Sequence, residues 1–240
     1  MSHQLLFSEA NSKLQKLEKR INKKIYSLDL VAGWSCPFAK DCKSKVVGTP
    51  YGLKVRDGLY TKFRCFSASQ EAMYSHVFLK RLKNYQTIKE LCNRPIELTK
   101  CINSSIPVDC EALRFHVSGD FFSKNYFKAA ISVAINNPSI MFYAYTKAIR
   151  FWFELYKSIP DNFRLTASIG GTQDVVIQSF MRTVRVVKNK DDAKRLGLSL
   201  DNDDYHAYKN TNMKNPEHFA LLIHGVQPTN KKDSLYEKVL

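Results

Sequence analysis

The sequence is expected to contain no segment that would carry the chain into or across a membrane. No apolar run approaches the roughly 20 residues that span a bilayer. The first residues, MSHQLLFSEANSK, have neither the basic region nor the apolar core of a secretory signal. We therefore expect a protein that remains in the compartment where it is made and has no membrane partner.

The motifs of several enzyme classes are also absent. There is no Walker phosphate loop, no dinucleotide-binding glycine fingerprint, no HExxH helix and no GxSxG nucleophile turn. The paired C-x(2-4)-C knuckles of zinc fingers and zinc ribbons do not occur either. These absences exclude the enzyme classes that those motifs define, and they exclude a zinc ribbon.

Acidic residues are few beside basic ones, with 22 Asp and Glu against 37 Lys and Arg, for a net charge of +15. A field of this sign attracts polyanions such as nucleic acid. The basic residues are spread along the chain without a nucleic-acid motif. Solvated helix faces are the first explanation, and a functional basic surface that binds nucleic acid or a host protein is the alternative.

Apolar periodicity predicts one α/β domain with an appended helix. Residues 12–24 read as a short amphipathic helix, so we expect residues 1–24 to be an appendage and 25–240 a single domain. A strand is expected over 25–31, then a turn-rich stretch and a basic helix over about 69–85. The region 91–110 has no clear pattern.

From residue 113 onward, strands alternate with helices. Expected strands cover 113–119, 140–146, 163–169, 183–187 and 219–225, and expected helices cover 125–135, 149–159, 172–180 and 191–196. This alternation is typical of right-handed βαβ units and a parallel sheet. The sheet is expected to be either a partial (β/α) barrel or an open doubly wound sheet.

Three cysteines lie outside the regular pattern. Five residues separate Cys36 from Cys42, and twenty-two more separate Cys42 from Cys65. An iron–sulfur cluster binds one thiolate per iron and accepts such wide spacings. Burial as structural thiols is the alternative. Of the remaining cysteines, which are expected in the core, Cys110 is the candidate for a fourth ligand.

Polar residues follow several of the predicted strands. Period two places Arg114 and His116 on one face of their strand, and Asp120 comes after that strand. Ligands in parallel α/β folds bind beyond the carboxyl ends of strands. A buried structural role is the alternative for His116. Other candidates at such ends are Lys147, Ser168, Gly170 and Gly171, the glycines preceding a predicted helix N-terminus that could receive an anion.

With these residues in view, the chain resembles the phage-encoded gene product 88 family. The stretches that carry the resemblance are LDLVAGWSCPFAKDC, FRCFSASQEA, RFHVSGDFFSKNYF, FYAYTKAIRFW, NFRLTASIGG, DNDDYHA and FALLIHGVQP, in that order. They are spread along the chain from Ser27 to Pro228. The resemblance implies a bacteriophage protein that acts in the host cytoplasm.

That family is in turn distantly similar to radical S-adenosylmethionine (SAM) proteins. The similarity implies a distorted or partial barrel and a [4Fe-4S] cluster held by Cys36, Cys42 and Cys65, with SAM at the open iron. Asp120, Ser168, Gly170 and Gly171 would bind the cofactor, and the pocket would include Arg114, His116 and Lys147. The usual C-x3-C-x2-C loop is absent, since the third cysteine lies far downstream.

The resemblance favours a radical-SAM-like enzyme whose substrate the sequence does not identify. The alternative is a non-catalytic iron–sulfur or zinc module that binds nucleic acid or a host protein. In that case, Cys110 or His116 would complete the ligand set.

Overall fold

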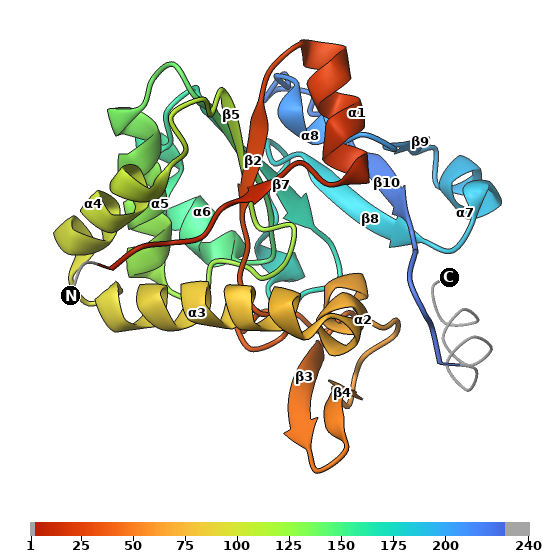
Figure 1. Cartoon of the computed structure of the whole chain (residues 1–240). Coiled ribbons are helices and arrows are strands. Elements are labelled where there is room, and N and C mark those ends of the chain that lie inside the picture. The colour runs from red at the N-terminus through yellow and green to blue at the C-terminus, as the bar shows by residue number, and fades with distance from the viewer. Residues whose placement is uncertain (1–2, 229–240) are drawn as a thin grey trace.

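An eight-stranded sheet forms the centre of the structure, a computed structural model that describes residues 3–228 (Figure 1). In spatial order the strands are β1 (Ser8–Glu9), β2 (Ile25–Leu28), β5 (Ala112–Phe115), β6 (Met141–Thr146), β7 (Phe163–Ser168), β8 (Thr183–Val187), β10 (Phe219–Leu222) and β9 (Ser199–Leu200). Among these described strands, only β1 is antiparallel to its neighbour. The predicted α/β class with parallel strands is confirmed. The sheet does not close into a barrel, because β1 and β9 are its two edges.

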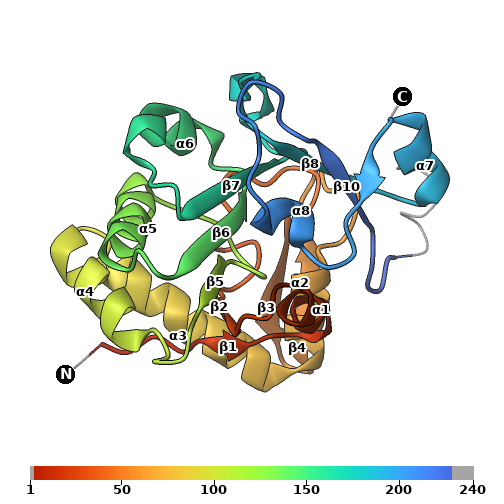
Figure 2. The same cartoon turned by 90° about the horizontal axis from the view of Figure 1, so that it is seen from above.

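Helices cover both faces of this sheet (Figure 2). They are α1 (Ser12–Ile21), α2 (Phe66–Met73), α3 (Ser75–Leu91), α4 (Pro95–Ser105), α5 (Lys124–Asn136), α6 (Ile149–Leu155), α7 (Lys190–Arg195) and α8 (Tyr205–Tyr208). The larger core lies between the sheet and α3 to α6, whereas α1 and α8 pack on the opposite face. The apolar side chains of Leu14 and Leu17 on α1 are fully buried there.

Capping residues explain where the predicted helices begin. The side chain of Asn11 accepts hydrogen bonds from the amides of Lys13 and Leu14, both at 3.1 Å, and starts α1. Ser123 caps α5 through the amide of Tyr126. Such caps satisfy amides that have no partner within the helix. The two helices predicted from these patterns are confirmed.

Other helices differ from the prediction. The single basic helix expected over 69–85 is two helices, α2 and α3, separated at Tyr74. Helix α4 lies in the region without a clear pattern and begins at Pro95, whose missing amide suits the first helical position. Within residues 3–228, no helix is long and apolar enough to cross a bilayer.

The turn-rich stretch contains a β-hairpin that the sequence pattern did not reveal. Strands β3 (Ser44–Thr49) and β4 (Gly52–Asp57) pair with each other in a separate two-stranded sheet. In Figure 1 this hairpin projects away from the main sheet beside α2. It occupies the interval between Cys42 and Cys65, so it accounts for the wide spacing of these cysteines.

Candidate functional site

The carboxyl ends of the central strands lie at one level. Leu28 of β2 is opposite Phe115 of β5, which is opposite Ala144 of β6. Thr146 at the end of β6 is opposite Ala167, next to the end of β7. The loops that follow these strands therefore meet at one edge of the sheet, the expected ligand-binding edge of a parallel α/β fold.

The three predicted cysteine ligands lie in the loops at this edge. Ser44 joins two of them, because its amide donates to the Cys42 carbonyl at 2.8 Å and its hydroxyl accepts from the Cys65 amide at 3.2 Å. The Lys43 side chain donates to the Cys36 carbonyl. The three cysteines are thus linked through two consecutive residues at the base of the hairpin.

A close contact fixes the first cysteine loop against this base. Gly33 has a φ of 72°, and a Cβ atom there would lie 2.2 Å from the Ser44 carbonyl oxygen. Only glycine combines the positive φ with the absent side chain that this approach requires. The geometry explains why glycine precedes the Trp34-Ser35-Cys36 segment.

The thiols influence one another electrostatically. Burial, then the neighbouring Cys42 thiol, raise the pKa of Cys65 to about 11. Burial also raises the pKa of Cys36. The negative charge of the Asp120 carboxylate and then those of the two other cysteines raise it further, by smaller amounts. Amides in the first turn of α2 act in the opposite direction on Cys65, because they donate hydrogen bonds that favour the thiolate.

The cysteines do not form a ready-made site for a single metal ion. Among residues 3–228, no group of three or more His, Cys, Asp or Glu side chains is arranged to hold one ion. Sulfur ligands of one tetrahedral zinc must approach to about 3.8 Å from each other, given Zn–S bonds of about 2.3 Å. Residues 3–228 therefore show no ready-made metal site, either for zinc or for the irons of a cluster.

The cysteine loop is attached to the loop after β7. The carbonyl of Gly170 accepts from the amides of Lys40 and Asp41, and the carbonyl of Phe38 accepts from the Thr172 amide at 2.8 Å. Ala39 and Gly171 form an isolated antiparallel bridge. Backbone hydrogen bonds thus hold the segment between Cys36 and Cys42 in place.

The predicted helix after Gly171 is wrong. Only a short 3-10 turn, Asp174–Val176, is present there. Its Asp174 carboxylate accepts from the amides of Gly170 at 2.8 Å and Gly171 at 2.9 Å. The two amides expected to receive an external anion therefore already bind a carboxylate of the same chain.

Asp120, Lys147 and Ser168 meet at this edge as predicted, and they bond to the protein itself. Asp120 accepts from the Thr146 hydroxyl at 2.6 Å and from the amides of Phe121 at 2.7 Å and Lys147 at 2.8 Å. The Lys147 ammonium donates to the Ser168 hydroxyl at 2.7 Å. It also donates to the carbonyls of Ser168 and Ile169. These side chains hold the ends of β5, β6 and β7 together.

The sequence analysis missed Glu71, a fully buried carboxylate on α2. It accepts from the Ala32 amide at 3.0 Å, the Ser118 hydroxyl at 3.1 Å and the Arg81 guanidinium at 3.2 Å. Burial raises its pKa, although Arg81 opposes this effect. Glu71 ties the loops after β2 and β5 to the helix that begins after Cys65. The only signal for it was an acidic residue in the FRCFSASQEA stretch.

Arg114 and His116 are not arranged as predicted. Strand β5 ends at Phe115, and His116 has a φ of 68°. The period-two alternation of the strand therefore stops before His116, and His116 does not share a face with Arg114. Arg114 pairs with Asp204 on the face covered by α1 and α8. His116 packs instead against Phe121, with ring centroids 4.6 Å apart. The two side chains therefore do not line one pocket.

The His116 imidazole is buried and neutral. Its Nε2 lies 2.9 Å from the Tyr126 hydroxyl, and its Nδ1 has no hydrogen-bond partner among the described residues. Burial lowers its pKa to about 3, and the positive charge of Arg114 acts in the same direction. This environment is that of a structural histidine, the alternative that the sequence left open for it.

Cys110 lies at the other end of the sheet from Cys36, Cys42 and Cys65. It precedes β5 and donates through its thiol to the Ala112 carbonyl at 3.3 Å, whereas the three cysteines lie beyond the carboxyl ends of the strands. The structure therefore argues against Cys110 as a fourth ligand. Cys101 is buried in the main core, as predicted, and Cys92 packs against it.

Comparison with known proteins gives one match. The family model described as Gene product 88 matches residues 5–235, nearly the whole chain. Neither the curated proteins nor the solved structures include a significant match. The resemblance noted from the sequence motifs is thus confirmed, while the similarity to radical SAM proteins has no such support. The chain belongs to the gene product 88 family.

Proposed function

We propose that Cys36, Cys42 and Cys65 bind a [4Fe-4S] cluster at the carboxyl edge of the sheet. The observation that carries this proposal is the linkage of the three cysteines through Ser44 and Lys43, although twenty-two residues separate the last two in sequence. A cluster takes one thiolate per iron, so its ligands stand farther apart than those of one zinc ion.

The surroundings of the cysteines suit cluster thiolates. Amides at the start of α2 face the Cys65 sulfur, and the Gly33 backbone makes the same kind of contact with Cys36. Hydrogen bonds of this kind stabilise thiolates and tune the potential of a cluster. Three thiolates side by side repel one another, so a positively charged metal group would be needed to keep them deprotonated.

Three cysteines leave one iron of such a cluster without a thiolate. We assign this position to SAM, in line with the resemblance to radical SAM proteins, where the bound cluster supplies the electron that cleaves SAM. The one-directional strand order from β2 to β8 supports a partial barrel of that type. Asp120 already accepts three hydrogen bonds, which leaves about one of its four lone-pair positions for a ligand amine.

The test is iron and sulfide analysis, with EPR spectroscopy, of protein purified without oxygen. We expect about four irons and four sulfides per chain. Replacing Cys36, Cys42 or Cys65 with Ala should abolish cluster binding. Cys92→Ala is the matched control and should retain iron, because within residues 3–228 Cys92 hydrogen bonds only to local groups, the Lys89 carbonyl and the Asn93 side chain.

The SAM assignment has its own outcomes. A change in the EPR signal of the reduced protein when SAM is added would support an open iron and an enzyme. A cluster that ignores SAM would favour a fully ligated, non-catalytic module. Stoichiometric zinc without iron in the purified protein would contradict the proposal of a [4Fe-4S] cluster. Family membership supports a phage protein that works in the bacterial cytoplasm.

A further inference from the structure

The hairpin between Cys42 and Cys65 carries a concentration of basic side chains. Strand register places Lys45 opposite Arg56, and Val47 opposite Lys54, so the three cations share one face. Like charges directly opposite each other destabilise a pair of strands. An isolated hairpin gains nothing from this arrangement, so a partner of opposite charge is the simplest reason for it.

Neighbouring basic residues have carboxylate partners within the described part of the chain, but these three do not. Arg64 pairs with Asp57 at 2.8 Å, and Lys62 pairs with Asp41 at 3.2 Å. Across residues 3–228, no ion pair joins Lys45, Lys54 or Arg56 to a carboxylate. We call these three residues the basic face of the hairpin.

Exposed aromatic rings lie among these cations. Tyr51 at the tip of the hairpin is 89% exposed, and the Lys54 ammonium lies 5.6 Å from its ring centroid. Trp34 is 46% exposed, with the Lys45 ammonium 3.9 Å above its ring. Large aromatic rings are usually buried. Exposed rings beside cations that have no carboxylate partner within residues 3–228 therefore indicate a flat, anionic partner.

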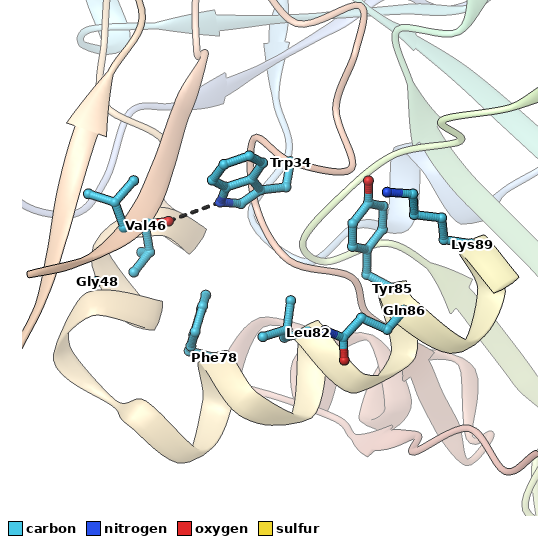
Figure 3. A pocket seen from close by; sticks show the side chains of 9 residues that line it. Trp34, Val46, Gly48, Phe78, Leu82, Tyr85, Gln86 and Lys89 are labelled. Carbon is cyan, nitrogen blue, oxygen red and sulfur yellow. Dashed lines mark hydrogen bonds between the residues drawn. The ribbon is translucent and has the colours of Figure 1, made fainter.

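An apolar groove of about 410 Å³ continues this surface (Figure 3). It lies between β3 and α3, and Figure 3 shows Trp34, Phe78 and Tyr85 around the same space. The Trp34 indole donates to the Val46 carbonyl at 2.9 Å, which fixes the ring at the groove wall. Lys89 provides a further cation at the rim.

We propose that the basic face, with Trp34, Tyr51 and the adjoining groove, is a binding site for single-stranded nucleic acid. Lys45, Lys54 and Arg56 would contact phosphates, and bases would stack on the exposed rings or enter the groove. Stacked aromatic rings combined with cations that follow the backbone are the features by which proteins bind single strands. The site lies beside Cys42 and Cys65, yet it is defined by residues other than the cysteines.

The test is fluorescence anisotropy of a labelled single-stranded oligothymidine with the full-length protein. If each of the three cations neutralises one phosphate, affinity should fall about 20-fold between 50 and 200 mM salt. For Lys54→Gln/Arg56→Gln, one contact remains, so affinity should be roughly 60-fold weaker at 50 mM salt and fall only about threefold over the same range. Tyr51→Ala should weaken binding about fivefold or more.

The matched control is Lys16→Gln/Lys19→Gln on α1. It removes the same charge from exposed positions at the other end of the molecule (Figure 1). Binding within about twofold of the unmodified protein is expected for this variant. Equal weakening by the control and the hairpin variant would show that only net charge matters and would overturn the proposal. The proposal would also be overturned if a duplex bound as tightly as the single strand and Tyr51→Ala did not weaken the binding of the duplex.

The outcome can be separated from that of the cluster proposal. Iron content of each variant is measured in parallel, and the hairpin variants should retain it. Loss of binding with iron retained supports the proposal. Unchanged binding in both hairpin variants refutes it, whatever the metal content.

Discussion

Replacing Arg114 with Leu should destabilise the protein by about 3 kcal/mol. The Asp204 carboxylate is fully buried, and it is bound by Arg114, by Lys13 at 2.6 Å and by the Tyr145 hydroxyl at 3.0 Å. Removing one partner from a buried ion pair costs about 3 to 5 kcal/mol, because the remaining charge stays desolvated. Lys13 and Tyr145 still neutralise and solvate Asp204, so the lower end of the range applies.

Urea denaturation measures this effect directly. With a slope of about 3 kcal/mol per molar urea, the midpoint should fall by about 1 M. Arg195→Leu is the matched control, since Arg195 makes an exposed pair with Asp192, and it should change stability by no more than about 0.5 kcal/mol. In Arg114→Leu/Asp204→Asn both charges are gone, and most of the stability should return; Asn also tolerates the φ of 63° at position 204.

Acidification provides a second check. The charges of Arg114 and then Lys13 lower the pKa of Asp204 in spite of its burial. A carboxyl whose folded pKa is depressed stabilises the protein above its unfolded pKa, and this stabilisation is lost as pH falls through the folded value. The difference between the unmodified protein and Arg114→Leu should therefore shrink below about pH 4. A loss at pH 7 equal to that of Arg195→Leu would refute the reasoning.

Three further predictions concern the loops near the cysteines. Gly119→Ala should lower the melting temperature by several degrees, because φ is 94° and the added Cβ would lie 2.7 Å from atoms of two buried neighbours; Gly48→Ala, where the space is open, is its control. Ser44→Ala removes the acceptor of the Cys65 amide. If the proposed cluster is bound, a chelator should remove iron faster from this variant than from the unmodified protein, and an unchanged rate would contradict this role for Ser44. His116, with its pKa near 3, should show no protonation by NMR between pH 5 and 8. Since the unfolded state binds a proton below about pH 6.5, stability should rise with pH from about 3 to 6.5.

Local patterns in the sequence were sufficient for the repeating part of the fold. Apolar runs ending at capping residues predicted β6, β7 and α5 to within one or two residues, because each signal lies within a few positions. The prediction of a helix after Gly171 was wrong because it also relied on signals from a few neighbouring positions. Asp174 resembles a first-turn acidic residue in sequence, but in the structure it turns back to bind two amides.

The candidate site depended more on contacts between distant residues. Asp120 and Lys147 could be placed at one edge from strand order alone, but their mutual hydrogen bond could not. The basic face was missed because Trp34, Lys45 and Arg56 come together only when the hairpin forms. In the sequence they are separate residues in a chain that is basic throughout.

If both proposed sites bind their ligands, the position of the hairpin between two of the cysteines would couple them thermodynamically. Ser44 begins β3, donates to the carboxylate of Asp57, its partner across the base of the hairpin, and accepts from the Cys65 amide. A metal group that orders Cys42 and Cys65 would also order the base of the hairpin. Thermodynamic linkage is reciprocal. If the bound metal raises the affinity for nucleic acid by some factor, bound nucleic acid must raise the affinity for the metal by the same factor. Nucleic acid would then slow the loss of iron, but only while it is bound to the protein.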